Sequence, residues 1–263
     1  MKIVSWNINS VRIRIPHLAR LVAAWKPDIL CLQETKVEDL LFPHDELEKL
    51  GFKHRYISGQ KSYNGVAILS KLPLSDVHSL DFAALGHRRH IAATLPGGEV
   101  LHNFYIPAGG DIPDVKLNPA YAAKLRFVEE MTDWSLTTGR KQKRLIALGD
   151  FNIAPLEHDV WSHKQLLGVV SHTPAEVERL TDLQKTLKWC DAGRHFTPHD
   201  QKLYSWWSYR NRDWRASNRG RRLDHIWLTP SAAEGLTGYE TLADARDWQA
   251  PSDHVPIAIT LES

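Results

Sequence analysis

Three apolar runs in the sequence end in side chains that could bind a metal ion or a phosphate. The run over residues 145–148 leads into Gly-Asp-Phe-Asn, which places Asp150 and Asn152 two residues apart. Alternate residues of an extended chain lie on one face, so a carboxylate and an amide would share a site if the strand continues to Asn152. The alternative is that both residues only shape a turn, which Gly149 would permit.

The other two runs end in the same kinds of side chain. Residues 1–7 are predicted as a strand that leads to Asn7 and Asn9, and residues 29–32 as a strand followed by Glu34. Glu34 alone would be an ordinary surface glutamate. Buried strands of one sheet bring their ends to a common edge, so the three endings together predict a shared polar site.

Helical spacing and capping signals predict three helices that would position this site. Apolar residues at i, i+3, i+4 and i+7 predict a helix over 16–25. Asn118-Pro119 supplies an N-cap and a first-turn proline for a helix that runs to about residue 134. Thr173 and Glu176 form a capping box that opens a third helix, which reaches Leu187.

The remaining periodic segments predict strands. Between residues 53 and 106, short β-type runs separated by turn residues predict one antiparallel block. Further strands are predicted over 223–228 and 255–261. Strands followed by helices, twice over, are compatible with two packed sheets.

Composition limits the class of protein. The 263 residues are 43% hydrophobic, which suffices for a sizeable core, and we expect a single domain over 1–263. The first ten residues contain no apolar signal segment, and no later run approaches the roughly 18 apolar residues of a membrane span. We therefore expect a soluble, cytoplasmic protein. Cys31 and Cys190 show no metal-binding spacing and are expected to be reduced thiols.

Aromatic and basic side chains lie close together in the last third of the chain. Trp206 and Trp207 stand in the aromatic segment 204–209, although the net charge of the chain is only +2. The arginines that follow are Arg210, Arg212, Arg215, Arg219, Arg221 and Arg222. Guanidinium groups beside aromatic rings suit nucleic-acid phosphates and an exposed base or sugar. The alternative is a solvated basic loop over a core aromatic strand.

Three more polar residues stand beside predicted strands. Asp253 and His254 precede the terminal strand, and Asp224 lies in the strand before it. A histidine with an acidic neighbour and a second acid as partner is a candidate catalytic group. Tyr105 ends a strand immediately before Ile106-Pro107, where it is either a core aromatic or a functional phenol.

The motifs that contain these residues resemble those of the exonuclease III family of apurinic/apyrimidinic endonucleases. In chain order they are SWNINSVR (5–12), LQETK (32–36), NGVAILSK (64–71), YIPAGG (105–110), GDFNIAP (149–155), YSWWSYR (204–210), RRLDHIWL (221–228) and PSDHVPI (251–257). The resemblance implies an α/β, DNase I-like four-layer sandwich, in which two mixed β-sheets pack together between helices.

The resemblance further implies an activity and its partners. The activity is Mg²⁺-dependent hydrolysis of DNA in base excision repair, 5′ to an abasic site, leaving a 3′-OH. Exonuclease activity in the 3′–5′ direction and 3′-phosphodiesterase or phosphatase activity accompany it. The expected partner is double-stranded DNA with abasic sites or blocked 3′ ends, bound by a monomer associated with the nucleoid.

Residue roles also follow from the resemblance. Glu34 and Asp253, with the amides of Asn7 and Asn9, would form an oxygen-rich site for Mg²⁺ or Mn²⁺, and Asp150 and Asn152 a second metal site. The catalytic set would be Asp150 as activator of the attacking water, Asn152 and Tyr105 as hydrogen-bonding groups, and His254 oriented by Asp224. Trp206 would wall a pocket for an extruded abasic sugar.

The sequence departs from the family pattern at three positions. Asn9 stands where many members have Asp, Ala108 where many have an amide, and Arg221 where some relatives have an apolar pocket wall. Two other functions remain open. One is an inositol or lipid phosphoesterase, which would not require the basic aromatic segment, and the other is a non-catalytic DNA-binding module, which would be expected to lose some of the acids.

Overall fold

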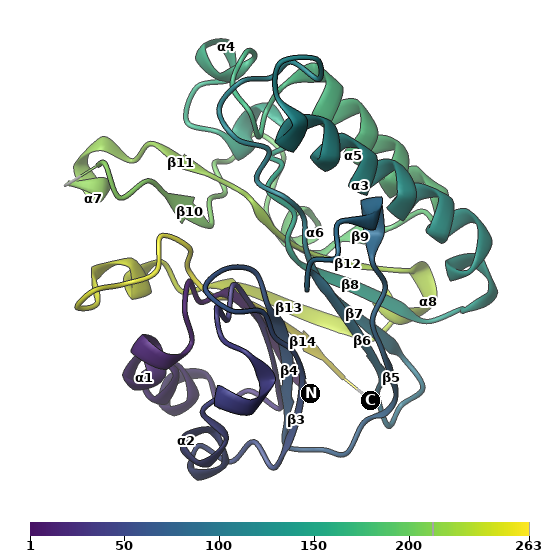
Figure 1. The fold of residues 1–263 in the computed structure, drawn as a ribbon, viewed down its shortest axis with the longest axis vertical. Helices are drawn as coiled ribbons and strands as arrows, with labels where there is room; N and C mark the ends of the chain where they lie inside the picture. The colour runs from purple at the N-terminus through teal and green to yellow at the C-terminus, as the bar shows by residue number, and fades with distance from the viewer. Residues whose placement is uncertain (212, 263) are drawn as a thin grey trace.

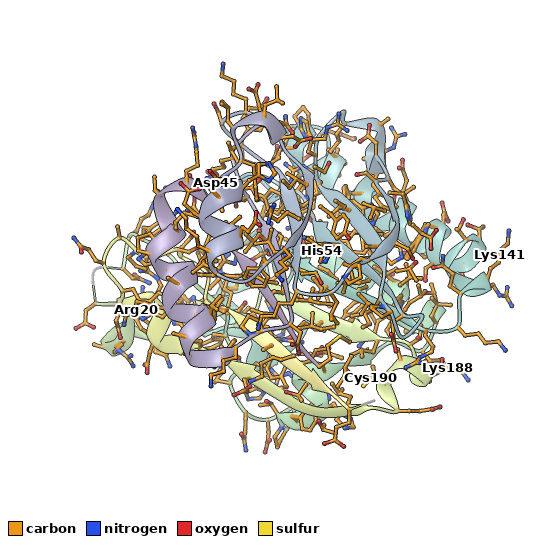
Figure 2. The ribbon with its side chains drawn as sticks, turned by 90° about the horizontal axis from the view of Figure 1, so that it is seen from below. Arg20, Asp45, His54, Lys141, Lys188 and Cys190 are labelled. Atoms are coloured by element: carbon orange, nitrogen blue, oxygen red, sulfur yellow. The ribbon has the colours of Figure 1, made fainter. Side chains whose placement is uncertain are left out.

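The computed structural model describes residues 1–211 and 213–262. Two six-stranded mixed sheets pack face to face, with α1 and α2 outside the first sheet and α3 and α5 outside the second (Figure 1). The predicted four-layer sandwich is confirmed. In Figure 2, Arg20 on α1 and Asp45 on α2 lie on one side of the molecule, and Lys141 lies on the other.

Each sheet combines parallel and antiparallel strands. The first sheet has the order β13 (Leu236–Thr241), β14 (Ile257–Leu261), β1 (Lys2–Asn7), β2 (Ile29–Gln33), β4 (Val66–Ser70) and β3 (His54–Ser58). The second has the order β5 (Ser75–His78), β6 (His90–Thr94), β7 (Val100–Tyr105), β8 (Leu145–Asp150), β12 (Asp224–Leu228) and β9 (Cys190–Asp191). The parallel pairs are β1 with β2 and β7 with β8. A separate two-stranded ribbon joins β10 (Trp206–Trp207) to β11 (Gly220–Arg221).

The three predicted helices begin and end close to the predicted positions. The α-helices are α1 (Ile15–Trp25), α2 (His44–Lys49), α3 (Pro119–Thr137), α4 (His163–Leu166), α5 (Pro174–Thr186), α6 (Ala192–Phe196), α7 (Trp214–Ser217) and α8 (Pro230–Ala233). Short 3₁₀ segments are Arg12–Arg14, Asp39–Leu41, Phe82–Ala84, Gly139–Lys141, Glu157–Asp159 and Ala243–Asp247. The Asn118 cap of α3 and the Thr173–Glu176 capping box of α5 are both present, which confirms these two signals. None of the helices in the described part of the chain has the length and apolarity to cross a membrane.

The predicted antiparallel block over 53–106 is wrong as a single unit. β3 and β4 pair with each other in the first sheet, whereas β5, β6 and β7 belong to the second. Turn residues indicate where neighbouring strands reverse, but they do not determine which sheet each strand joins. That membership depends on pairing with β2 and β8, which are distant in sequence.

Side-chain alternation along the strands determines which residues reach the space between the sheets. In β8, Ile146 and Leu148 pack between the sheets, whereas Leu145 and Ala147 pack beneath the helices. Successive side chains point to opposite faces, so Asp150 continues the inner row. The same alternation places four other strand-end residues on the inner side. They are Asn7 of β1, Gln33 of β2, Tyr105 of β7 and Asp224 of β12.

Gly149 does not form the predicted turn. It lies inside β8 with a φ of +133°, and a Cβ atom there would approach the Phe104 carbonyl oxygen to 1.9 Å. Glycine is therefore required by the close approach of β7 rather than by a reversal of the chain.

Two histidines are buried on the outer face of the second sheet. His90 accepts a hydrogen bond from the Leu80 N–H, and its other ring nitrogen lies 3.0 Å from His102 Nδ1. Burial lowers the pKa of His90 well below its usual value and that of His102 to about 3. Both rings are therefore neutral in the folded protein, whereas both titrate near pH 6.5 when the chain unfolds.

We predict that acid destabilises the fold through this pair. Between about pH 6.5 and pH 3 the unfolded chain binds protons that the folded protein does not, so the free energy of unfolding falls as pH falls. Each histidine contributes a slope of up to about 1.4 kcal/mol per pH unit. Urea unfolding from pH 7 to pH 4 should show a shallower slope for His102→Gln, and an unchanged slope for the exposed control His199→Gln. An equal slope in wild type and His102→Gln would contradict this account.

Candidate active site

One buried amide joins two carboxylates that come from different sheets. Asn7, at the end of β1, donates hydrogen bonds from Nδ2 to Glu34 Oε1 at 2.8 Å and to Asp150 Oδ2 at 2.9 Å. Asn7 ends β1 and Glu34 follows β2, both in the first sheet, whereas Asp150 ends β8 of the second. The three strand ends that the sequence predicted to share a site therefore do meet.

The chain bends sharply after Asp150. The strand ends at Asp150, and Asn152 has a φ of +53°, so the condition that extended geometry continues to Asn152 is not met and the alternative of a turn applies. The Asn152 backbone N–H donates to Asp150 Oδ1 at 2.9 Å, and its side-chain amide donates to Asp150 Oδ2 at 3.1 Å. The turn and the shared site therefore coexist, because the turn itself brings the Asn152 amide onto the carboxylate.

His254 lies between two acids. Its Nδ1 donates to Asp224 Oδ2 at 2.8 Å, and its Nε2 lies 3.6 Å from Asp150 Oδ2. Ser205 Oγ also donates to Asp224 Oδ2, at 2.6 Å. Burial by itself lowers the pKa of His254, but the Asp224 and Asp150 carboxylates outweigh burial and raise it to about 10. The imidazole is therefore cationic at neutral pH.

The pKa values of the two site acids are shifted in opposite directions. Asp150 is almost fully buried, and burial raises its pKa to about 7 despite the nearby His254 cation. At Glu34 the effect of burial is outweighed by hydrogen bonds from Asn7 and Lys36, which lower the pKa of its carboxyl. Tyr105 donates from its hydroxyl to Glu34 Oε1 at 2.8 Å, and burial raises the pKa of this phenol well above its usual value. At neutral pH Glu34 is thus a carboxylate and Tyr105 a hydrogen-bond donor.

The residues predicted as metal ligands offer oxygen atoms to a cation. Lys36 Nζ lies 2.8 Å from Glu34 Oε2 and 2.6 Å from Asn9 Oδ1, so these two oxygens already share one positive charge. Asn9 Nδ2 in turn donates to Asp253 Oδ1 at 3.2 Å. Carboxylate and amide oxygens are the ligands that Mg²⁺ prefers, so the donor set fits a hard divalent cation.

A second group of potential ligands lies deeper in the site. Among the described residues, Asp150, Asp224 and His254 have ligand atoms within 4.8 Å of one another. His254 is cationic and donates to Asp224, so this group is a hydrogen-bonded chain in the present arrangement.

The polar centre opens into a cavity of about 670 Å³. Glu34, Tyr105, Asn152, Asp253 and His254 line one part of it. The remaining lining includes Ala108, Trp161, Leu166, Val170, Ser171, Trp206, Arg210, Arg219, Arg221 and Leu223. Trp206 Nε1 donates to Asp253 Oδ2 at 3.0 Å, which fixes the indole at the boundary between the two parts. The volume suffices for a small organic ligand such as a sugar phosphate.

Three of the residues predicted to bind DNA do not line this cavity. Trp207 is buried against Trp214 and Tyr204, and its Nε1 donates to Asn218 Oδ1 at 3.2 Å. Its predicted contact with DNA is wrong, because adjacent residues of β10 point to opposite faces. Arg215 is exposed but forms ion pairs with Asp244 and Asp247.

The predicted contact of Arg222 with DNA is also wrong. Only 1% of its surface is exposed, and its guanidinium forms ion pairs with Asp159 and Asp191. A guanidinium whose charge is already balanced by two carboxylates in the interior cannot reach a DNA phosphate. Arg212 lies outside the described residues. Arg210, Arg219 and Arg221 are thus the predicted arginines that line the cavity.

A buried ion pair that was not predicted from the sequence holds the cavity loops together. Lys124 and Glu176, from α3 and α5, form a salt bridge with both side chains fully buried. Lys124 Nζ also donates to the Asn152 carbonyl at 2.8 Å and the Ala108 carbonyl at 3.2 Å. Glu176 accepts from the Ser171 N–H at 2.9 Å. A lysine in an amphipathic helix is normally expected to be solvated, so the sequence alone did not indicate that Lys124 is buried and binds the loops at Ala108 and Asn152.

The sandwich and its acidic, histidine-containing centre define a class of phosphoesterase. The chain belongs to the Endonuclease/Exonuclease/phosphatase family, whose family model matches residues 4–254. It is 31% identical to the exodeoxyribonuclease III of Haemophilus influenzae over 98% of both chains. The family resemblance inferred from the motifs is therefore confirmed.

Solved structures give the same result. The structure of the 3′ phosphatase NExo from Neisseria, bound to a product DNA hairpin, matches with a TM-score of 0.91 and 32% identity. An AP endonuclease from Archaeoglobus fulgidus matches with a TM-score of 0.92 and 31% identity. Both comparisons cover 100% of this chain and 100% of the other.

Proposed function

We propose that this protein is a divalent-metal-dependent DNA phosphodiesterase of base excision repair. It hydrolyses the phosphodiester 5′ to an abasic site and leaves a 3′-OH, and it also removes nucleotides or phosphate groups from 3′ ends. The observation that best supports this function is the Asn7-linked pair of Glu34 and Asp150, which lies beside the His254 cation at one end of a cavity lined by tryptophan and arginine. The relatives named above act on DNA ends and abasic sites.

The residues divide the chemistry between them. Asp150, whose pKa of about 7 suits a general base, accepts a proton from the attacking water, and Asn7 and Asn152 hold its carboxylate in place. The His254 cation, oriented by Asp224, binds the scissile phosphate and stabilises negative charge in the transition state. Tyr105 is a hydrogen-bond donor at the same phosphate or at the leaving oxygen.

The metal belongs to the same proposal. Mg²⁺, or Mn²⁺ in its place, would be held by Glu34 and Asp253 with Asn7 and Asn9 in support, and Asp150 and Asn152 would form a second site. When bound, such a cation would polarise the phosphate and neutralise charge on the leaving oxygen. Asn9 in place of an aspartate leaves this site with one negative charge fewer, which should weaken its affinity for the cation.

The alternative substrates fit less well. An inositol or lipid headgroup would use the same acids but has no need of an aromatic and basic cavity wall. A DNA-binding module without catalysis has no need of the buried carboxylates and their hydrogen bonds. A single domain over 1–263, a monomeric state and a cytoplasmic location at nucleoid DNA complete the proposal.

A duplex with a single abasic site tests the activity. We expect incision 5′ to the lesion with Mg²⁺ and none with chelator. Asp150→Asn is nearly isosteric and removes the base, so kcat should fall at least roughly a hundredfold. Gel analysis of the products and circular dichroism of the variant are the measurements. Incision that persists in chelator would contradict the metal requirement, and near-normal incision by Asp150→Asn would remove this residue from the base role.

The adjacent tryptophans provide a matched pair of variants. Trp207→Ala empties a core position and should lower the free energy of unfolding by about 3–5 kcal/mol. Trp206→Ala should cost less stability but should reduce the preference for abasic over intact duplex, because an extruded sugar contacts the cavity wall. Thermal melting and cleavage of both duplexes distinguish the two. Unchanged discrimination by Trp206→Ala would remove its indole from the sugar pocket.

A further inference from the structure

Backbone pairing places Arg221 two strands away from His254, with Trp206 between them. Arg221 pairs with Trp206 in the β10–β11 ribbon, and Trp206 forms an antiparallel bridge with His254. Directly paired residues of antiparallel strands lie roughly 4.5–5.5 Å apart and point to the same face. Arg221 and His254 therefore face the same cavity, with the Trp206 indole between them.

The Arg221 guanidinium is held in a fixed orientation. It lies over the Trp206 ring at 5.2 Å from the centroid, and its Nη1 donates to the Val170 carbonyl at 3.2 Å and to Ser171 Oγ at 2.8 Å. Within the described part of the chain, Nε and Nη2 donate to no protein acceptor. One edge of the guanidinium is thus anchored and another is available to a ligand.

The positive charge of the cavity lining exceeds what a neutral sugar requires. Arg219 lies over Trp161 at 4.8 Å in the same cavity, so with Arg210 and Arg221 three guanidinium groups line it. A partly buried cation is stabilised by an anion with which it can form hydrogen bonds. The planar fork of arginine matches the two oxygens of a carboxylate or phosphate.

We propose that Arg221 forms an anion subsite one indole width beyond the scissile phosphate, so that this cavity prefers substrates that have a second anionic group there. This inference rests on the proposed function. Two sources share the chemistry: the carboxylate of a 3′-phosphoglycolate end, and the next phosphate of a continuous strand. A 3′ end with a neutral substituent lacks the second group.

The reaction is the same hydrolysis for each substrate. Water forms a new bond to phosphorus as the bond from phosphorus to O3′ breaks. The strand oxygen takes up a proton and becomes the 3′-OH. With the glycolate substrate, the phosphoglycolate departs with its carboxylate at Arg221.

A set of 3′ ends that differ in one charge tests the subsite. The probes are duplexes that end in 3′-phosphoglycolate or in the neutral 2-hydroxyethyl ester of the same 3′-phosphate, together with an internal tetrahydrofuran site. A charge-assisted hydrogen bond corresponds to roughly tenfold to a hundredfold. Wild type should therefore show kcat/KM at least roughly tenfold higher for the glycolate than for the hydroxyethyl ester. Arg221→Met should remove that ratio, and Arg221→Lys should keep part of it.

Two control variants separate charge from structure. Ser171→Ala removes an anchor of Arg221 but not its charge, so the ratio should persist. Arg179→Met removes an arginine from α5 that pairs with Glu129, and it should leave the ratio unchanged. If the only role of Arg221 is to hold residues 170–171 in place, Ser171→Ala and Arg221→Met would change kcat/KM for the glycolate and the hydroxyethyl ester by the same factor. That result would overturn the subsite.

The outcomes are distinct from failure of the proposed function. If wild type cleaves none of the three substrates, the proposed function fails. If it cleaves them with no preference for the glycolate, or if Arg221→Met keeps the preference, only the subsite is overturned. If Arg221→Met lowers kcat/KM for the glycolate substrate alone, the anion bound by Arg221 is the terminal carboxylate. If it lowers kcat/KM for the internal site equally, Arg221 binds the flanking phosphate as well.

Discussion

The active site depends on one neutral amide that donates a hydrogen bond to each of two carboxylates. Asn7 bridges Glu34 of the first sheet and Asp150 of the second. Without this shared donor, the neighbouring Glu34 and Asp150 carboxylates would raise each other's pKa, and one of them would be favoured to take up a proton. Cationic groups flank the pair, so that donors and acceptors alternate along the chain Lys36, Glu34, Asn7, Asp150, His254 and Asp224. This alternation lets both carboxylates share one site.

Most of this centre could be located from the sequence because the features that position it depend on residues close together in the chain. Apolar strands with side chains of alternating direction end in Asn7 and Asp150, and another such strand begins with Asp224. Caps such as Asn118 and Thr173 likewise act within three residues of themselves. Features of this kind can be predicted from the order of residue types, and the resemblance to a family supplied the roles that spacing could not.

The remaining features depend on partners far away in the chain. Arg221 and Arg222 are adjacent, yet one lines the cavity and the other is buried with Asp159 and Asp191. A sequence shows six arginines but not which of them meets a carboxylate in the folded protein. Lys124 is comparable, because its partners Asn152 and Glu176 approach only when α3, α5 and the loop after β8 have packed together.

The most direct test of this account is the substitution Asn7→Asp, which keeps the size of the side chain but replaces two donors with a third negative charge. Cleavage of an abasic duplex and the melting temperature would be measured together. We expect kcat to fall at least roughly a hundredfold in a protein that still folds, because the Glu34 and Asp150 carboxylates lose their common donor and move apart. Near-normal turnover by a folded Asn7→Asp variant would contradict the central role of the amide.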